Sequence, residues 1–294
     1  MIKIILDTDL GRDCDDAGAL ALLHTLAAEG KADILAVMLC TSAISSAVTA
    51  KMINEWYGKG DIPIGKYDKK AFLEEEICKT FTEPLMNKYL QNHSMPAFEN
   101  PVRTYRQILS ENDDVTIAVI GMVNNIADLL RSGADDISSL SGAELVKQKV
   151  KNMYVMGGNF VDSTYAEYNI VCDVESAKYV SENFPAPIIY CGFELGENIK
   201  SGTALLEADE ENPVRFAYFR HCTRDRIPHF SWDPVTVYCA VEQDSPLYEK
   251  SCNMKITFND EAKTVKGGEG KDCYLIAKAS DNVIQSKIDG LIRG

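Results

Sequence analysis

Short apolar runs alternate along the chain with helix-length amphipathic segments. The runs at residues 3–6, 34–39, 116–120, 152–155 and 187–190 are largely apolar and rich in β-branched side chains. They are typical of central parallel strands that helices cover on both faces. Helical patterns follow at 16–28, 47–57, 125–131 and 175–181. This order predicts an α/β fold with a doubly wound, mostly parallel sheet flanked by helices, built on a Rossmann-like core.

The C-terminal part of the chain predicts two further strands and a helix. Strand-like runs at 254–258 and 272–276 flank the glycine-rich stretch 266–270, which we interpret as a turn, and an amphipathic helix is predicted at 282–292. Asp173 is expected to N-cap the helix at 175–181. The polar stretch 135–142 is the best linker candidate, but strand and helix patterning resumes directly after it. We therefore expect residues 1–294 to form a single domain.

Four of the five strand-like runs end in polar residues, and the fifth ends in Gly192-Phe193-Glu194. In chain order the polar residues are Asp7 and Asp9, Thr41 and Ser42, Asn124, Asn159, and Glu194. In open α/β sheets, ligands bind beyond the carboxyl ends of the strands. We therefore expect these residues, although far apart in the sequence, to converge on one crevice.

Composition narrows the classes of partner. The formal net charge of −14 argues against binding to nucleic acids or anionic membranes, because both favour basic surfaces. No apolar run reaches the roughly 18 residues of a membrane-spanning helix, and the N-terminus turns polar too early for a signal peptide. None of the nine cysteines forms a C-x-x-C pair, so the spacing does not support a structural zinc site or a thioredoxin-like motif. Several cysteines lie in apolar runs, which indicates buried thiols in a reducing compartment, by default the cytoplasm.

Five aspartates fall within ten residues, between the first strand and the first helix: Asp7, Asp9, Asp13, Asp15 and Asp16. One or two of them would be ordinary turn formers or helix caps. Five cannot all cap one helix, and their repulsion at close range would be costly without a cation. Ca²⁺ and Mg²⁺ prefer such an all-oxygen environment. The loop therefore predicts a divalent metal site.

Five motifs, in order from residue 7 to residue 234, resemble those of the inosine–uridine nucleoside hydrolase family. The N-terminal fingerprint is similar to Asp7-Thr8-Asp9-Leu10-Gly11 followed by Asp15-Asp16-Ala17. Later segments are similar to the G-x-L-T-N-I-A, M-G-G, A-E-F-N…D-x-x-A-A and H-D-P motifs: GMVNNIA at 121–127, MGGN at 156–159, AEYN at 166–169 with Asp173 and Ala177, and WDP at 232–234. The resemblance implies metal-dependent hydrolysis of the N-glycosidic bond of small ribonucleosides, as in nucleoside catabolism and purine salvage. It also implies a homo-oligomer, a dimer or a tetramer.

The resemblance implies a role for each matched residue. The metal, expected to be Ca²⁺ although Mg²⁺ would also suit the ligands, would be held by Asp9, Asp16, Asp233 and the backbone carbonyl of Asn124. Asp9 would also act as general base towards water, and Asp7 would orient the loop. The ribose hydroxyls would be held by Asp15, Asn159, Glu167 and Asn169. Glu194, at the end of the fifth strand, is a further candidate for the sugar pocket.

The chain departs from the family pattern at three places. Asp13 and Cys14 are extra residues in the aspartate loop, so Asp13 is an alternative to Asp15 as a ligand. Thr41-Ser42 stands where the family has G-N. Trp232 replaces the histidine of H-D-P, and an indole cannot protonate a leaving base at neutral pH. We hypothesise that Trp232 stacks on the nucleobase, which favours purines, and that His229 is the candidate replacement acid.

Two other functions compete with a nucleoside hydrolase. Haloacid-dehalogenase-type phosphatases also begin with a strand and D-x-D, but Leu10-Gly11-Arg12 and the later motifs have no place in them. A non-catalytic nucleoside-binding or ribosyl-binding protein on the same fold would explain Trp232 and the altered end of the second strand. Retention of Asp9 and all the proposed metal ligands favours the enzyme.

Overall fold

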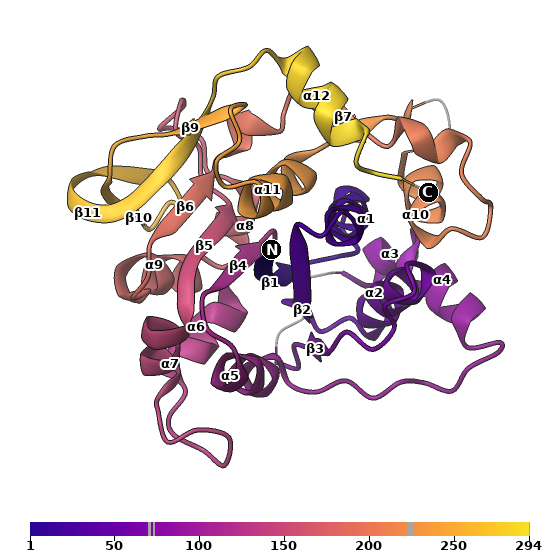
Figure 1. The fold of residues 1–294 in the computed structure, drawn as a ribbon, viewed down its shortest axis with the longest axis horizontal. Coiled ribbons are helices and arrows are strands. Elements are labelled where there is room, and N and C mark those ends of the chain that lie inside the picture. Colours follow the sequence, from indigo (N-terminus) through magenta and orange to yellow (C-terminus); the bar gives the residue numbers. More distant parts are fainter. Residues whose placement is uncertain (70–71, 73, 223–225, 294) are drawn as a thin grey trace.

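A nine-stranded sheet forms the centre of the computed structural model, which describes residues 1–69, 72, 74–222 and 226–293 (Figure 1). Its strands, in spatial order, are β10 (Met254–Phe258), β11 (Thr264–Ala277), β6 (Ile188–Cys191), β5 (Val150–Met156), β4 (Val115–Val119), β1 (Ile2–Thr8), β2 (Ala32–Leu39) and β3 (Ile64–Lys66), with β9 (Tyr248–Lys250) paired to β11. The pairings from β11 through β6 to β3 are parallel, whereas β9 and β10 run antiparallel to β11. A separate antiparallel pair joins β7 (Lys200–Ser201) and β8 (His229–Phe230). The predicted doubly wound, mostly parallel sheet is confirmed.

The order of the strands reverses next to β1. The chain runs from β1 outward to β2 and β3, then returns to β4 on the other edge of β1 and continues to β5 and β6. Ligands of doubly wound sheets bind at the carboxyl ends of the strands where this reversal occurs. The aspartate loop leaves β1 at this point, and Asn124 follows β4 there.

Helices cover both faces of the sheet (Figure 1). One face carries α1 (Asp15–Ala28), α2 (Ile44–Trp56), α10 (Pro213–Cys222), α11 (Trp232–Val241) and α12 (Asp281–Asp289), and the other carries α5 (Pro101–Glu111), α6 (Asn124–Arg131), α7 (Gly142–Lys149) and α9 (Val174–Asn183). Shorter elements are α3 (Glu75–Cys78), α4 (Thr82–Tyr89), α8 (Tyr168–Cys172), and the 3₁₀ helices η1 (Phe193–Leu195) and η2 (Thr203–Leu206). Because successive strand residues point to opposite faces, Ile4 and Leu6 of β1 enter one core and Ile5 enters the other.

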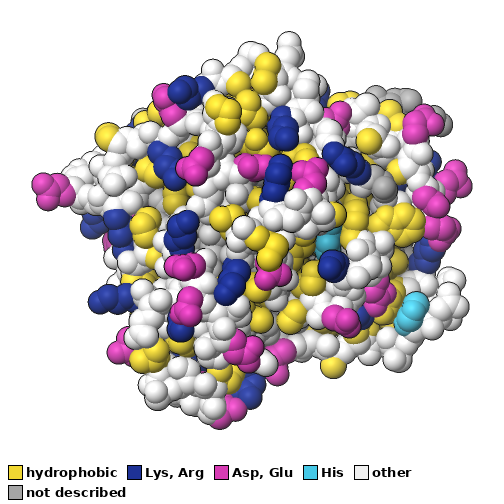
Figure 2. All heavy atoms as spheres, viewed as in Figure 1, with side chains coloured by type: hydrophobic (Ala, Val, Ile, Leu, Met, Phe, Trp, Pro, Cys, Tyr) yellow, Lys and Arg dark blue, Asp and Glu magenta, His cyan; other side chains and the backbone are white. Residues whose placement is uncertain are grey.

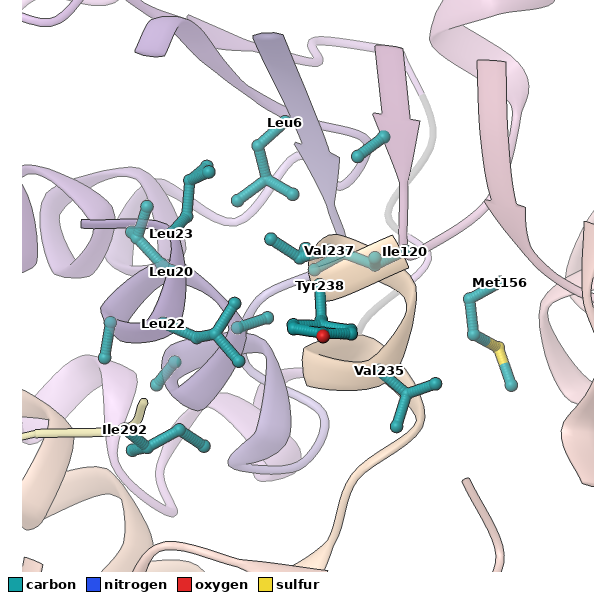
Figure 3. Close-up of a cluster of buried hydrophobic side chains, with 14 of the residues drawn as sticks. Leu6, Leu20, Leu22, Leu23, Ile120, Met156, Val235, Val237, Tyr238 and Ile292 are labelled. Carbon is teal, nitrogen blue, oxygen red and sulfur yellow. The ribbon is translucent and has the colours of Figure 1, made fainter. Parts of the chain in front are cut away.

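Helices α1 and α11 pack against each other beneath the sheet (Figure 3). Leu20 and Leu22 of α1, and Val237 and Tyr238 of α11, are buried in the same cluster. Burial of each aliphatic side chain contributes roughly 1.5–3 kcal/mol. This packing holds the N-termini of both helices in fixed positions beside the end of β1.

The sequence-based elements agree with the structure except near the C-terminus. All seven predicted strands and the helices at 16–28, 47–57, 125–131, 175–181 and 282–292 are present. Their ends lie within three residues of the predicted ones, except that β11 begins eight residues before the run at 272–276. Asp173 caps α9 by accepting a hydrogen bond from the Ser176 amide at 3.2 Å. The turn predicted at 266–270 is wrong, because these residues belong to β11 and the chain turns earlier, between Asn259 and Lys263. The glycines instead allow a bulge, where the pairing with β10 jumps from Gly267 to Asp272.

The surface carries charges of both signs. Acidic and basic side chains are interspersed over the face shown in Figure 2, as expected for a surface that is acidic overall without a basic stripe on this side. Among the described residues, no helix combines the length and the apolar composition needed to cross a bilayer.

Candidate active site

A cavity of about 190 Å³ lies beyond the carboxyl end of β1. Its lining combines carboxylates, an amide and aromatic rings from both ends of the sequence: Asp9, Arg12, Asp13, Asp15, Asp16, Ile120, Met156, Glu167, Tyr168, Asn169, Phe193, Trp232 and Asp233. The N-termini of α1, α8 and α11 all reach this cavity. Because helix N-termini favour negative charge, they suit the carboxylates gathered here.

Four carboxylates form a cluster in which oxygens of Asp13, Asp15, Asp16 and Asp233 all lie within 4.8 Å of one another. The Asp233 amide donates to Asp15 Oδ2 at 3.2 Å, and the Thr8 hydroxyl donates to Asp16. Burial and the neighbouring aspartates raise the pKa of Asp15, Asp16 and Asp233 well above the usual range. Such a cluster needs protons or a cation to offset its repulsion. Its all-oxygen donor set fits a hard divalent cation.

Asp13 and Asp15 both belong to the carboxylate cluster. Asp13 and Asp15 were alternatives in the sequence, yet the structure brings both into the cluster. The Asp15 amide donates to Asp13 Oδ1 at 3.3 Å, which closes the loop around the pair. The two inserted residues therefore lengthen the loop without removing Asp15 from the site.

Asp9 lines the same cavity from the end of β1. Burial, and then the charge of Asp13, raises the pKa of Asp9 to about 7. Gly121 passes so closely that a Cβ there would lie 2.8 Å from both the backbone nitrogen and Oδ1 of Asp9. Asn124, the predicted carbonyl ligand, begins α6 and donates its Nδ2 to the Cys40 carbonyl at 3.0 Å, but it is not among the lining residues. The glycine of the GMVNNIA motif is thus explained by this close approach to Asp9.

Asp7 lies behind the cavity and is fully buried. It accepts hydrogen bonds from the Tyr105 hydroxyl at 2.8 Å and from Asn125 Nδ2 at 3.0 Å. Burial raises the pKa of Asp7 to about 8 against the effect of these bonds. These contacts tie α5 and α6 to the strand that carries the aspartate loop.

Glu167 and Asn169 line the cavity at the start of α8. Glu167 accepts hydrogen bonds from the amides of Asn169 at 2.9 Å and Ile170 at 3.2 Å, and burial raises its pKa to about 7. Asn169 Nδ2 donates to the Ile120 carbonyl at 3.3 Å. Both side chains are therefore held in position before any ligand arrives.

Two of the predicted sugar-binding residues do not line the cavity. Asn159 Oδ1 accepts hydrogen bonds from the Val161 and Asp162 amides at 3.0 and 2.7 Å, which commits this oxygen to its own turn. Glu194 accepts a hydrogen bond from the Phe160 amide at 3.2 Å. The sugar-binding roles of both residues stay predictions.

Aromatic rings form one wall of the cavity. Trp232 packs against Phe193 and Phe230, with ring centroids 5.3 and 5.4 Å away, and its Nε1 donates to the Phe193 carbonyl at 3.0 Å. The guanidinium of Arg12 lies 3.8 Å from the ring centroid of Tyr168. Sequence reasoning missed these last two residues. Their signals were weak: Arg12 adjoins the loop insertion, and Tyr168 replaces the phenylalanine of A-E-F-N.

His229 is not among the cavity-lining residues of the described chain. Its ring lies 5.0 Å from that of His221 and 5.7 Å from that of Phe230. The candidate leaving-group acid therefore faces a different set of side chains, behind the aspartate loop.

Comparison with known proteins supplies the family. Residues 4–282 match the sequence profile described as inosine-uridine preferring nucleoside hydrolase. No curated protein matches the sequence significantly. The inosine-uridine preferring nucleoside hydrolase of Bacillus anthracis is 16% identical with a TM-score of 0.72, over 100% of this chain and 99% of that chain.

Two other solved structures share the fold. A plant nucleoside hydrolase is 19% identical, with a TM-score of 0.74 over 100% of this chain and 99% of its own. A purine-preferring ribonucleoside hydrolase from Gardnerella vaginalis is 14% identical, with a TM-score of 0.73 over 99% of each chain. The profile spans nearly the whole sequence and leaves no place for the phosphatase alternative. The chain belongs to the inosine-uridine preferring nucleoside hydrolase family, whose members are N-ribosyl hydrolases.

Proposed function

We propose that this chain hydrolyses purine ribonucleosides to free base and ribose and that the reaction depends on a divalent cation, Ca²⁺ or, alternatively, Mg²⁺. The observation that carries the proposal is the cluster of Asp13, Asp15, Asp16 and Asp233 beside Asp9 in one cavity. Ligands of doubly wound sheets bind at the carboxyl ends of the strands, so a nucleoside bound there would lie beside both the cation and a carboxylate that can act as general base.

The cation would be held by Asp16 and Asp233, with Asp9 and the Asn124 carbonyl as the further ligands that the family resemblance implies. Asp13 and Asp15 lie in the same cluster, and four adjacent carboxylates repel one another in a buried site. This repulsion supports the binding of a cation there. When bound, a divalent cation supplies positive charge that lowers the pKa of a nearby water.

Asp9 would act as the general base. It accepts a proton from water, whose oxygen forms a bond to the anomeric carbon of the ribose as the bond from that carbon to the base nitrogen breaks. Without a cation, burial and the charge of Asp13 raise its pKa to about 7. A divalent cation beside it would favour the ionised carboxylate, which is the form that accepts a proton. The base leaves with the electron pair of the broken bond and takes up a proton. The surrounding carboxylates stabilise the positive charge that develops on the ribosyl group.

The substrate would be oriented from both ends. Asp15, Glu167 and Asn169 would hold the ribose hydroxyls, since their side chains line the cavity and are fixed by backbone hydrogen bonds. Trp232 would stack on the nucleobase, which favours the larger purine surface. The position of His229 outside the lining offers little support for it as the leaving-group acid, so protonation of the base would come from another donor.

The test is release of ribose and base from inosine, adenosine, guanosine, uridine and cytidine, with wild-type protein and with Asp9→Asn. We expect purine nucleosides to be cleaved faster, chelator to abolish turnover, and Asp9→Asn to lose on the order of 10²- to 10⁴-fold in kcat. Turnover that survives both chelator and Asp9→Asn would contradict the mechanism.

The second candidate function is nucleoside binding without catalysis, which the replacement of the family histidine by Trp232 favours. In that case calorimetry would detect nucleoside binding, while no sugar would be released even at high protein concentration.

A further inference from the structure

Two cysteines and two histidines gather behind the aspartate loop, outside the proposed catalytic cavity. One possible ligand atom from each of Cys14, His221, Cys222 and His229 lies within 4.8 Å of all the others. The two sulfurs are 3.5 Å apart, and both cysteines are buried while both histidines are half-buried. The four residues come from three places in the fold: the cap of α1, the end of α10, and β8. The last two are neighbours in the sequence, whereas Cys14 and Cys222 are 208 positions apart.

This ligand set has the chemistry of a tetrahedral zinc site. Structural zinc ions bind two thiolates and two imidazoles with Zn–S distances of about 2.3 Å, which places the sulfurs roughly 3.8 Å apart in a tetrahedron. The observed separation of 3.5 Å is close to that value. A disulfide would instead need a sulfur–sulfur distance of about 2.05 Å and would have no use for two imidazoles beside it. The two clusters also differ in softness, because oxygen donors suit Ca²⁺ and sulfur and nitrogen donors suit zinc.

We propose that Cys14, His221, Cys222 and His229 bind one zinc ion, which fastens the aspartate loop to α10 and β8. On binding, each of the two cysteine thiols releases its proton to solvent, and the two histidines coordinate as neutral imidazoles. Cys14 stands between Asp13 and Asp15, and His229 lies three residues before Trp232. The zinc ion therefore positions both the carboxylate cluster and the aromatic wall without touching the substrate.

The site makes use of one departure from the family pattern, because Cys14 is one of the two extra residues of the loop. His229 does not line the proposed catalytic cavity. The inference stands apart from the proposed reaction, since zinc binding by these four side chains does not depend on which bond the cavity cleaves.

The experiment measures zinc in the full-length protein after zinc loading and removal of free metal, together with the absorption spectrum of the Co²⁺-loaded protein. We expect about one zinc ion per wild-type chain. With Co²⁺ we expect the visible bands of a tetrahedral ion and a thiolate-to-cobalt charge-transfer band. Cys222→Ser and His229→Asn should each lose most of the zinc and the thiolate band.

Two matched variants locate the metal. Cys252→Ser removes an exposed cysteine elsewhere in the chain, and Asp233→Asn weakens the carboxylate cluster. Both should keep the zinc and the thiolate band.

Three outcomes would overturn the proposal: wild-type protein that retains no zinc, zinc that persists in Cys222→Ser, or non-reducing peptide mapping that links Cys14 to Cys222 as a disulfide. The wild-type measurements decide the matter even if a variant folds poorly.

Discussion

Trp232 stands where the family pattern has a histidine, and its proposed role is to stack on the nucleobase. It faces the cavity, has Phe193 and Phe230 packed around it, and fixes its orientation through the bond from Nε1 to the Phe193 carbonyl. Stacking of a base on an aromatic ring contributes roughly 1–3 kcal/mol. We therefore expect Trp232→Ala to lower kcat/KM for inosine by about 10- to 100-fold, measured by base release.

Trp232→Phe is the matched comparison, because it keeps an aromatic ring and removes the Nε1 donor. Turnover close to wild type in this variant would assign the effect to stacking. A loss as large as that of Trp232→Ala would assign it to the hydrogen bond, and an unimpaired Trp232→Ala would rule out a role in base binding.

At the scale of single residues, the sequence was enough to predict the cluster of carboxylates, but not all of the residues around it. Five aspartates in one loop predict a cation site from the sequence alone, because their mutual repulsion has to be offset in any fold. The pairing of Cys14 with Cys222 leaves no such signal, since 208 residues separate them and no short spacing links them. The motif predicts that Asn159 binds the sugar, yet its side-chain oxygen accepts hydrogen bonds within its own turn, a local preference that asparagine shows widely.

The elements around the site are joined through Asp7. Its carboxyl group receives hydrogen bonds from Tyr105 on α5 and Asn125 on α6, where no water reaches it. Loss of one partner leaves a buried polar group unsatisfied, which costs roughly 1–3 kcal/mol. We expect Tyr105→Phe to lower the free energy of unfolding by about this amount in urea denaturation.

The matched control for that experiment is Tyr179→Phe, which changes a half-buried tyrosine on α9. It should leave the unfolding midpoint close to wild type. Equal midpoints for wild type and Tyr105→Phe would mean that the bond to Asp7 contributes nothing to stability.

Elements were predictable where their pattern is long and continuous. β2 and α1 are long and apolar on nearly every side, since both are covered on both faces. β3 is only three residues long, too short to show a period, and the sequence did not reveal it. The glycines at 266–270 have the composition of a turn, but they lie within β11, which pairs with β10. Their conformational freedom allows the bulge in this pairing.

Across the whole molecule, the fold forces together charges that the unfolded chain keeps apart. The reversal of strand order beside β1 and the packing of α1 on α11 bring Asp233 within 4.8 Å of Asp13, Asp15 and Asp16. The chain already carries a net charge of −14, so this cluster adds local repulsion to a surface that repels itself. Stability should therefore respond to both pH and divalent cations.

The direction of the pH response follows from the raised pKa values. In the folded chain, burial raises the pKa of Asp9 to about 7 and that of Asp7 to about 8, whereas aspartates in the unfolded chain titrate near 3.9. Between these values the folded state binds more protons than the unfolded state, so stability falls as pH rises from about 4 to 8. With chelator present, we expect the melting temperature to be lower at pH 8 than at pH 5.5.

Calcium should reverse this loss, because a cation competes with protons for the same carboxylates and binds best when they are ionised. Binding to the folded state alone stabilises it by about 2.7 kcal/mol at a concentration 100 times Kd. We therefore expect the rise in melting temperature on adding Ca²⁺ to be larger at pH 8 than at pH 5.5 and to disappear in Asp233→Asn. Repulsion among the other acidic side chains also destabilises the fold at high pH. The difference between wild type and Asp233→Asn therefore measures the part of the effect that is due to the cluster. An equal rise at both pH values, or one that survives in Asp233→Asn, would place the cation somewhere other than the four carboxylates.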